Sequence, residues 1–413
     1  MILTLAQTSG GSIAPLTAMD VLLSVVKIVA VILLLLGAFA YMTWFERRVL
    51  ARMQWRLGPN RVGPFGLLQP MADGLKLLFK EQLLPAQAHP FLFLLAPCIS
   101  LVVALSVFAV VPFGGTEPWD LFGVPLAPWI ADVDVGILFV LGVTSLGVYG
   151  IVIAGWSSGN HYALLGAIRS TAQVISYELA MGMALLSPLL LSSVFTDSGL
   201  GTLSLRELVL AQERGGWFAF YLPFAFGIYW VAGIAETNRA PFDLPEAEQE
   251  LIAGYHTEYS GMRFAMFFMA EYVAMITLSS IGTTVFLGGA GSPFRALFVT
   301  FGLPVPAFLG LLAAPGPWWF VLKVFLFMFV FVWLRATFPR FRYDQLMRLG
   351  WQVMLPLALM NVAITAFFVA LGWPAGPTRW AILATALAAV GLLSLAGALR
   401  RRATHPPGPG GQA

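Results

Sequence analysis

The chain has 413 residues, of which 59% are hydrophobic and only 10% are charged. Soluble globular domains carry about 25% charged residues, and disordered or nucleic-acid-binding chains need high charge, so these three classes are excluded. A formal charge of +3 is too small to indicate an anionic partner. The composition indicates a polytopic membrane protein, because each membrane-spanning helix needs about 20 apolar residues.

Residues that hold metals or act as nucleophiles are scarce and scattered. Cys98 is the only cysteine, so the chain can form neither an internal disulfide nor an iron–sulfur cluster. The four histidines lack metal-ligand spacing, and no nucleophile motif is present. We therefore predict no metal site and no catalytic residue in this chain, and any redox centre must lie on another subunit.

Nine apolar segments predict an all-α bundle of about nine transmembrane helices. They cover residues 18–45, 90–112, 133–155, 171–194, 217–235, 262–287, 318–334, 351–371 and 379–399. The first follows an uncharged stretch, residues 1–17, which lacks the basic region of a signal peptide, so we expect a retained helix. Residues 18–399 form the bundle, and the Pro/Gly-rich residues 400–413 form a tail.

Cationic residues predict the orientation. Seventeen Arg and Lys residues fall in the loops on one side of the bundle and only four on the other. Because cytoplasmic loops carry the excess of cations, the N-terminus is predicted outside and the C-terminus inside, which requires an odd number of spans. Only four lysines accompany the many arginines, a usage typical of GC-rich bacterial genomes. We expect a multi-pass protein of the bacterial inner membrane.

The first inner loop, residues 46–89, contains an amphipathic helix. After the turn-rich stretch 58–64, apolar residues recur at helical spacing, while Asp73, Lys76 and Lys80 share another face. The apolar residues are Leu67, Leu68, Met71, Leu75, Leu78 and Phe79. Some 16 residues with three charges cannot span a membrane but can lie along its surface. The helix is either an interfacial anchor or the wall of an opening that admits an amphiphilic ligand.

Two acids, Glu178 and Glu271, and two lysines, Lys27 and Lys323, lie inside apolar segments rather than at their ends. A carboxylate such as Glu178 or Glu271 at this depth costs several kcal/mol unless it is paired, hydrated or protonated. Such acids favour a proton relay, and a structural hydrogen bond between helices is the alternative. For Lys27 and Lys323 we expect snorkelling or local pairing.

The third inner loop, residues 236–261, concentrates acids around one internal cation, Arg239. The first five acids are Glu236, Asp243, Glu246, Glu248 and Glu250. Acids after Pro245 are typical of a helix N-terminus, but like charges at the i, i+4 spacing repel each other. Prolines on both sides of Asp243 favour an extended backbone, which membrane proteins tolerate where it lines a cavity. The loop therefore forms either a water-filled acidic cavity or a solvated connection.

Three motifs resemble one family, the H-type membrane subunit of respiratory complex I, called NADH-ubiquinone oxidoreductase chain 1 in mitochondria. They are ETNRAPFDLPEAEQELIAGY from Glu236, GPNRVGPFGLLQPMADGLKLLFKE from Gly58, and WFERR from Trp44. The resemblance runs from about residue 20 to residue 372. Many members have eight spans, so the segment 379–399 departs from the family, as does the long outer loop 288–317.

The resemblance implies a subunit at the junction of the hydrophilic and membrane arms of a proton-pumping NADH:quinone oxidoreductase. It would bind no cofactor itself: quinone is the substrate, and the iron–sulfur clusters and FMN lie on other subunits. Its partners would be the hydrophilic subunits at the quinone site and the adjacent membrane subunits.

The resemblance also implies roles for particular residues. The amphipathic helix, with the first and sixth spans, would border the quinone entrance. Residues of the quinone chamber would be Arg61, Asp73, Lys76, Arg239 and Asp243. Residues of an acidic path toward the proton-pumping subunits would be Glu46, Glu178, Glu236, Glu246, Glu248, Glu250 and Glu271.

Two other functions agree with parts of the sequence. A homologous component of a membrane-bound hydrogenase-type complex would use no quinone, and the Arg- and Pro-bearing chamber motifs favour the quinone branch. A stand-alone secondary transporter would need inverted structural repeats, and no repeat is visible in the sequence.

The asymmetry of the cations predicts that the tail after the ninth segment is cytoplasmic. A reporter that works only in the cytoplasm should therefore be active when it is fused at Pro406. Activity of a periplasmic reporter at the same site would remove the ninth span or reverse the orientation.

Overall fold

The structure is a computed structural model that describes residues 18–121, 124–196, 199–243, 254–301, 304, 306 and 310–371. Within these residues, seven helical runs are long and apolar enough to cross a membrane. The second to sixth of these runs are formed by α3 (Pro90–Val107), α4 (Gly136–Ser157), α5 (His161–Ser192), α10 (Gly261–Phe286) and α13 (Pro317–Thr337). The first is α1 (Ala18–Met53), and the last joins α14 (Tyr343–Arg348), a π-helical segment (Leu349–Met354) and α15 (Leu355–Ala370).

The predicted fifth span is a broken helix rather than a continuous one. It consists of α7 (Phe218–Tyr221) and α8 (Pro223–Glu236). The break falls at Leu222, because Pro223 lacks the N–H that a continuous helix would use and instead occupies the first turn of α8. The predicted ninth span, 379–399, lies outside the described residues, as do residues 1–17 and the tail 400–413.

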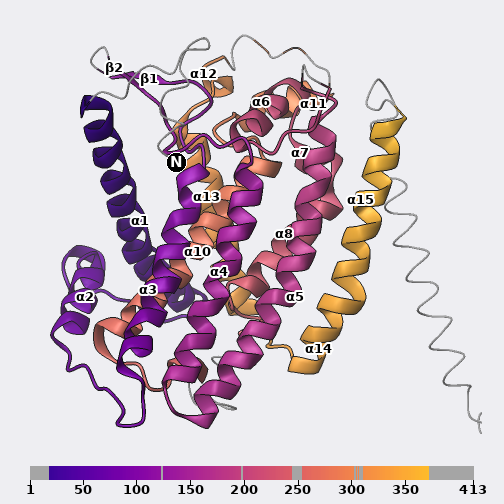
Figure 1. Ribbon diagram of the computed structural model, residues 1–413. Helices are drawn as coiled ribbons and strands as arrows, with labels where there is room; N and C mark the ends of the chain where they lie inside the picture. The colour runs from indigo at the N-terminus through magenta and orange to yellow at the C-terminus, as the bar shows by residue number, and fades with distance from the viewer. Residues whose placement is uncertain are drawn as a thin grey trace, which may run out of the picture.

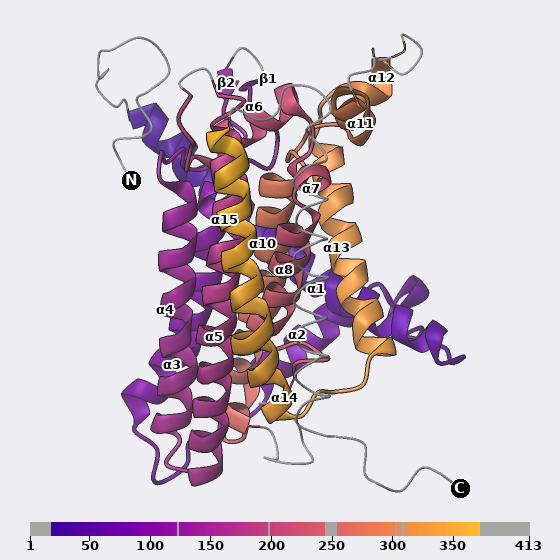
Figure 2. The ribbon, with the colours of Figure 1, turned by 90° about the vertical axis from the view of Figure 1, so that its right-hand side faces the viewer.

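Short elements cap the two ends of the bundle (Figures 1 and 2). One end carries α6 (Leu205–Gly215), α11 (Pro293–Phe301), α12 (Gly310–Ala313) and a small antiparallel hairpin of β1 (Trp119–Leu121) and β2 (Val124–Leu126). This is the predicted outer end, and sequence analysis missed its hairpin and short helices. The all-α membrane class is confirmed, with this hairpin as a minor exception.

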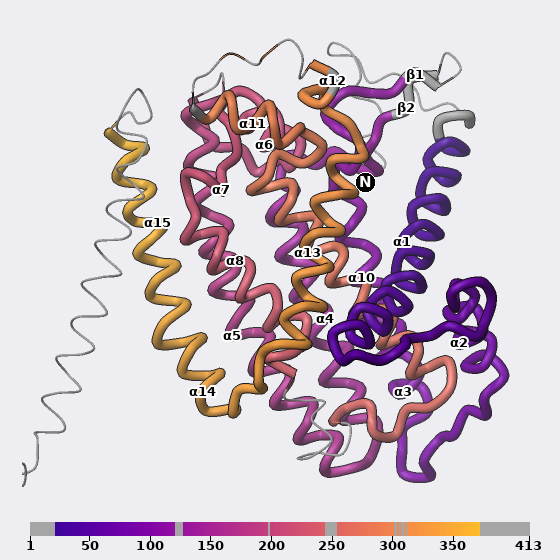
Figure 3. Tube along the Cα trace, turned by 180° about the vertical axis from the view of Figure 1, so that it is seen from behind, coloured from indigo at the N-terminus to yellow at the C-terminus, as the bar shows by residue number. Residues whose placement is uncertain are grey.

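The predicted amphipathic helix is confirmed as α2 (Gln69–Phe79). It lies beside the bundle, toward the end that carries α14, and none of its residues is buried (Figure 3). Met71, Leu75, Leu78 and Phe79 are all more than half exposed. An exposed apolar face on a short helix is typical of an element that lies in a membrane interface.

Helix α10 is central, whereas α1 and α15 lie at opposite edges of the bundle (Figures 1 and 3). Helix α10 packs against α1, α3, α8 and α13. Small residues allow the neighbouring helices to approach closely: a side chain at Gly150 of α4 would clash with Ser100 of α3, and one at Gly155 would clash with Ala167 of α5. Helices α3, α4 and α5 are thereby packed closely side by side.

The intramembrane lysine Lys323 is paired locally. Only 5% of it is exposed, and its Nζ donates to the carbonyls of Leu287, Gly289 and Gly291 at 2.6, 2.8 and 2.6 Å. The same ammonium lies 4.7 Å from the ring centre of Trp217. One side chain of α13 therefore fixes the connection that follows α10. Lys27 is paired more weakly, through a single hydrogen bond of 3.2 Å to the carbonyl of Trp129.

Lys323→Met should destabilise the protein strongly, because it leaves three buried carbonyls without a donor at about 1–3 kcal/mol each. Lys27→Met is the matched control, since it removes one intramembrane ammonium with one partner. Thermal unfolding of the purified protein should show a clearly larger loss for Lys323→Met. Equal losses would contradict the assignment of Lys323 as the anchor of this connection.

Candidate functional site

The connection after α8 turns its charged residues into the bundle. Asn238 adopts a left-handed backbone with φ of 50°, a conformation that asparagine tolerates better than most residues. The Arg239 amide then donates to the carbonyl of Ile234 at 3.3 Å, and the Phe242 amide donates to the carbonyl of Arg239 at 2.8 Å. These bonds close a tight turn that buries Arg239, which is 7% exposed.

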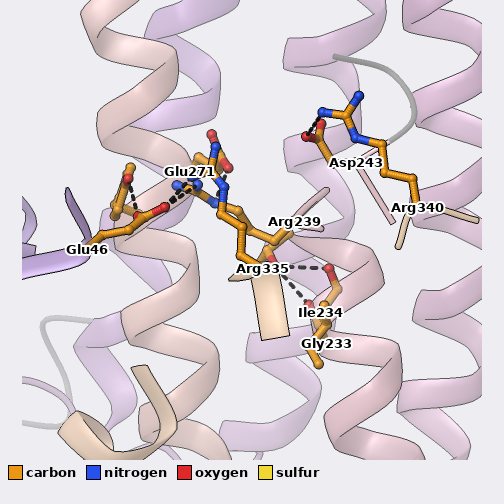
Figure 4. A network of polar contacts seen from close by, with 10 residues as sticks. Glu46, Gly233, Ile234, Arg239, Asp243, Glu271, Arg335 and Arg340 are labelled. Carbon is orange, nitrogen blue, oxygen red and sulfur yellow. Dashed lines mark hydrogen bonds and ion pairs between the residues drawn. The ribbon is translucent and has the colours of Figure 1, made fainter. Parts of the chain in front are cut away.

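Arg239 lies between two carboxylates from different helices (Figure 4). Its Nε is 2.5 Å from Oε1 of Glu271 on α10, and its Nη1 is 3.6 Å from Oε1 of Glu46 on α1. The guanidinium also lies 4.3 Å from the ring centre of Tyr272. The turn after α8 is thus tied electrostatically to two transmembrane helices.

Glu46 has two further partners that sequence analysis missed. Its Oε2 accepts a hydrogen bond of 2.6 Å from the Tyr272 hydroxyl, and its Oε1 pairs with Arg335 at the end of α13. Two carboxylates and two guanidinium groups therefore compensate one another. Glu46 and Arg239 are buried and need such partners, whereas the side chain of Arg335 is 41% exposed. We name Glu46, Arg239, Glu271, Tyr272 and Arg335 the Arg239 cluster. The position of Tyr272 directly after Glu271 was the only signal for it in the sequence.

A second ion pair lies beside the cluster. Nη2 of Arg340 is 3.1 Å from Oδ2 of Asp243, which is 8% exposed (Figure 4). Burial raises the pKa of the Asp243 carboxyl, and Arg340, Arg335 and Arg239 oppose that rise. The protonation of Asp243 therefore depends on the positions of three arginines. Arg340, like Arg335, was missed as a site residue because it was counted only as an inner cation.

A cavity of about 140 Å³ adjoins the cluster. Apolar residues of α3, α4, α5, α8 and α10 line most of it. The acids that line it are Glu236 and Glu271, and Asn238 lines it as well. A water molecule needs about 10–15 Å³ of such volume, so the cavity has room for several water molecules.

Glu178 lies next to the cavity rather than in its lining. Its carboxylate accepts a hydrogen bond from Ser145 and a longer one, 3.5 Å, from Thr144, which itself lines the cavity. Glu178 is also close enough to Glu236 for their charges to interact. The structure therefore brings four of the predicted path acids, Glu46, Glu271, Glu236 and Glu178, to one region.

The predicted chamber residues of the first inner loop form a separate group. Asp73 on α2 pairs with Arg47 at 2.6 Å and with Lys76 at 4.0 Å, and Arg61 is exposed. None of these residues forms an ion pair with the Arg239 cluster within the described ranges. The two groups meet through α1, since Glu46 belongs to the cluster while the next residue, Arg47, holds α2.

The remaining predicted acids, Glu246, Glu248 and Glu250, lie outside the described residues. The described end of the same loop contains His256, which contacts the rings of Tyr255, Phe264 and Phe267. Burial lowers the pKa of His256 to about 3, so its imidazole is neutral at physiological pH. Across the described ranges, no three His, Cys, Asp or Glu residues are grouped as metal ligands.

Comparisons with known proteins agree on one family. Residues 26–366 match the NADH dehydrogenase family. The chain is 52% identical over 340 residues to the NADH-quinone oxidoreductase H subunit of Thermomicrobium roseum, covering 80% of this chain and 91% of that relative. It is 49% identical over 348 residues to NADH-quinone oxidoreductase subunit 8 of Thermus thermophilus, covering 84% and 87% of the two chains. An H subunit of the same enzyme from Koribacter versatilis is 49% identical over 368 residues, with 86% and 99% covered.

The cluster predicts a strong energetic coupling between Arg239 and Glu271. Arg239→Met should destabilise the protein by about 3–5 kcal/mol, because it strands buried carboxylates. The double variant Arg239→Met/Glu271→Gln should recover part of that loss in thermal unfolding. Arg206→Met should cost less, because it breaks a partly exposed pair with Asp132 at the other end of the bundle, a hydrogen bond to the Thr116 carbonyl and a contact with the Trp129 ring, and strands no buried carboxylate. An Arg239→Met variant as stable as Arg206→Met would contradict the coupling.

Proposed function

The chain belongs to the NADH dehydrogenase family, and on that premise we propose that it forms much of a quinone chamber and of an acidic path for protons. It is a membrane subunit of an NADH-quinone oxidoreductase, and its partners are other subunits of that complex. Its own part in the reaction is to hold quinone and to couple quinone reduction to proton translocation. Electrons arrive from redox centres on partner subunits.

One observation carries this proposal: the ion pair of Arg239 and Glu271 is largely buried and lies directly beside a cavity that is lined by two acids, Glu236 and Glu271. A quinone headgroup that gains electrons must collect protons or remain an anion. At an effective dielectric constant of about 20, a unit charge 4 Å away is worth about 4 kcal/mol, or about three pKa units. A charge change next to Arg239 or Asp243 is therefore large enough to shift protons among the neighbouring acids.

The path that we propose follows contacts between groups and, at one step, a cavity that two acids share. It begins at the Arg239 cluster, where Glu46 and Glu271 share one guanidinium. It crosses the cavity from Glu271 to Glu236, and it leaves through the Thr144 and Ser145 hydroxyls to Glu178. Ser145, which bonds the Glu178 carboxylate, is exposed on the surface of the bundle. A carboxylate at membrane depth needs a polar partner rather than lipid. We assign this surface to contact with an adjacent membrane subunit.

The quinone entrance is assigned to α2 and its neighbours α1 and α10. The exposed apolar face of α2 suits a ligand with an isoprenoid tail. The Arg47–Asp73 ion pair holds this helix against the end of α1. Arg61, Asp73 and Lys76 then line the approach to the chamber, while Arg239 and Asp243 belong to its inner part. Glu246, Glu248 and Glu250 would extend the acidic path, as the resemblance implies.

The orientation proposed is an outer N-terminus and a cytoplasmic C-terminus in the inner membrane of a bacterium.

The chamber is tested by Arg239→Lys in the intact complex. Lysine keeps the positive charge but not the planar fork that reaches both Glu46 and Glu271. NADH:quinone activity should fall by about tenfold or more, since a misplacement of about 1 Å can cost that much. NADH oxidation by a hydrophilic acceptor should remain, because it bypasses the chamber. Parental quinone activity, or the same loss in the control Arg206→Lys, would contradict the assignment.

The path is tested by Glu178→Gln and Glu271→Gln. Glutamine keeps the shape and most hydrogen bonds of glutamate but cannot carry a proton. Both variants should assemble, and both should lower quinone reduction and proton pumping together. The control is Glu258→Gln, an acid that is bonded to Asn160 at 2.8 Å and lies outside the path. If the two path variants pump at the rate of Glu258→Gln, these acids are structural.

A further inference from the structure

Helix α5 contributes a buried amide to the turn that carries Arg239. Gln173 is fully buried, and its Nε2 donates to the carbonyl of Ala235 at 2.8 Å and to the carbonyl of Phe242 at 2.9 Å. These two carbonyls stand on either side of residues 236–241. One side chain therefore joins both ends of the segment that contains Glu236 and Arg239.

The two partners of Gln173 determine what its side chain must be. Both are carbonyl oxygens, which only accept hydrogen bonds, so the NH₂ group and not the oxygen must face them. The amide oxygen has no hydrogen-bond partner among the described residues. Gln173 thus acts as a double donor, a role that glutamate or an apolar residue of the same size cannot take over.

Neighbouring residues on the same face of α5 reinforce this attachment. Ser170 Oγ accepts a hydrogen bond of 3.0 Å from Asn238 Nδ2, at the left-handed residue of the turn. One turn beyond Gln173, the ring of Tyr177 packs against Phe242 with centres 5.7 Å apart. Residues spaced at i, i+3 and i+7 share one helical face. This face of α5 therefore contacts the beginning, the middle and the end of the turn.

The position of the turn controls two ion pairs. It sets the 2.5 Å approach of Arg239 to Glu271 and the 3.1 Å approach of Asp243 to Arg340. We propose that Gln173 is a positioning residue of the quinone site, which holds Arg239 and Asp243 in place through the carbonyls of Ala235 and Phe242. This inference rests on the proposed chamber function, but the attachment of the turn can be measured independently of quinone.

The test is Gln173→Met in the purified, membrane-reconstituted complex. Methionine keeps length and volume but donates no hydrogen bond. The matched control is Asn361→Leu, which removes another buried amide bonded to α5, through Ser187 at 2.8 Å, far from the turn. Ser170→Ala is the milder companion, because it removes only the bond to Asn238. Two quantities are measured: hydrogen–deuterium exchange of amides 237–243, and the KM and kcat for quinone.

Gln173→Met should increase exchange across amides 237–243 and raise the KM for quinone by about fivefold or more, with NADH oxidation by a hydrophilic acceptor unchanged. Ser170→Ala should show the same changes at smaller size, and Asn361→Leu should show neither. Parental exchange in Gln173→Met and Ser170→Ala would overturn the positioning role. Increased exchange with a parental KM would support the role of Gln173 in attaching the turn but would contradict the assignment of the turn to the quinone chamber. The two failures are therefore distinguishable.

Discussion

A buried positive charge at Arg239 is the constraint on which the inner end of this protein depends. An isolated charge in this environment is prohibitively costly, so carboxylates must meet it from whichever helices are near. Glu46 and Glu271 supply them from α1 and α10, and Arg335 of α13 balances the sum. Three transmembrane helices and one connection are thereby held in a single arrangement. Because every member is paired with at least one other, a change of charge at one group is felt by all of them.

The same cluster explains why the acids lie where they do. Glu236 and Glu271 open on a common cavity with largely apolar walls, and such walls strengthen the electrostatic effect of any charge that enters. The proposed path depends on this shared cavity, since no direct contact joins Glu236 to Glu271 within the described residues. The broken fifth span contributes to this arrangement, since α8 ends at Glu236 and leads directly into the turn.

Sequence reasoning predicted the spans better than it predicted which side chains pair with the acids. Hydrophobic runs identify membrane helices because each helix satisfies its own backbone, so α3, α4 and α10 fall close to their predicted ranges. Pro223 hides a break within one apolar run, and the hairpin is too short to give a strand pattern. Arg335, Arg340 and Gln173 went unrecognised because pairing across more than 60 positions depends on tertiary packing, which a single sequence does not display. Conversely, Arg61, Asp73 and Lys76 were grouped with Arg239 by resemblance, whereas in the described residues they form no ion pair with the Arg239 cluster, and α2 only packs against two of the helices that carry it, α1 and α10.

The two cations of α13 have a mechanical consequence for the whole subunit. Lys323 holds the connection after α10 at one end, and Arg335 holds Glu46 of α1 at the other, so 12 residues and about 18 Å of helix separate two fixed points. A helix fastened in this way cannot slide along its axis to match bilayers of different thickness. It must tilt together with its neighbours, or the surrounding lipid must adjust, each at a modest cost per ångström. Bilayer thickness thereby becomes a physical variable that bears on the geometry of the ion pairs at the inner end.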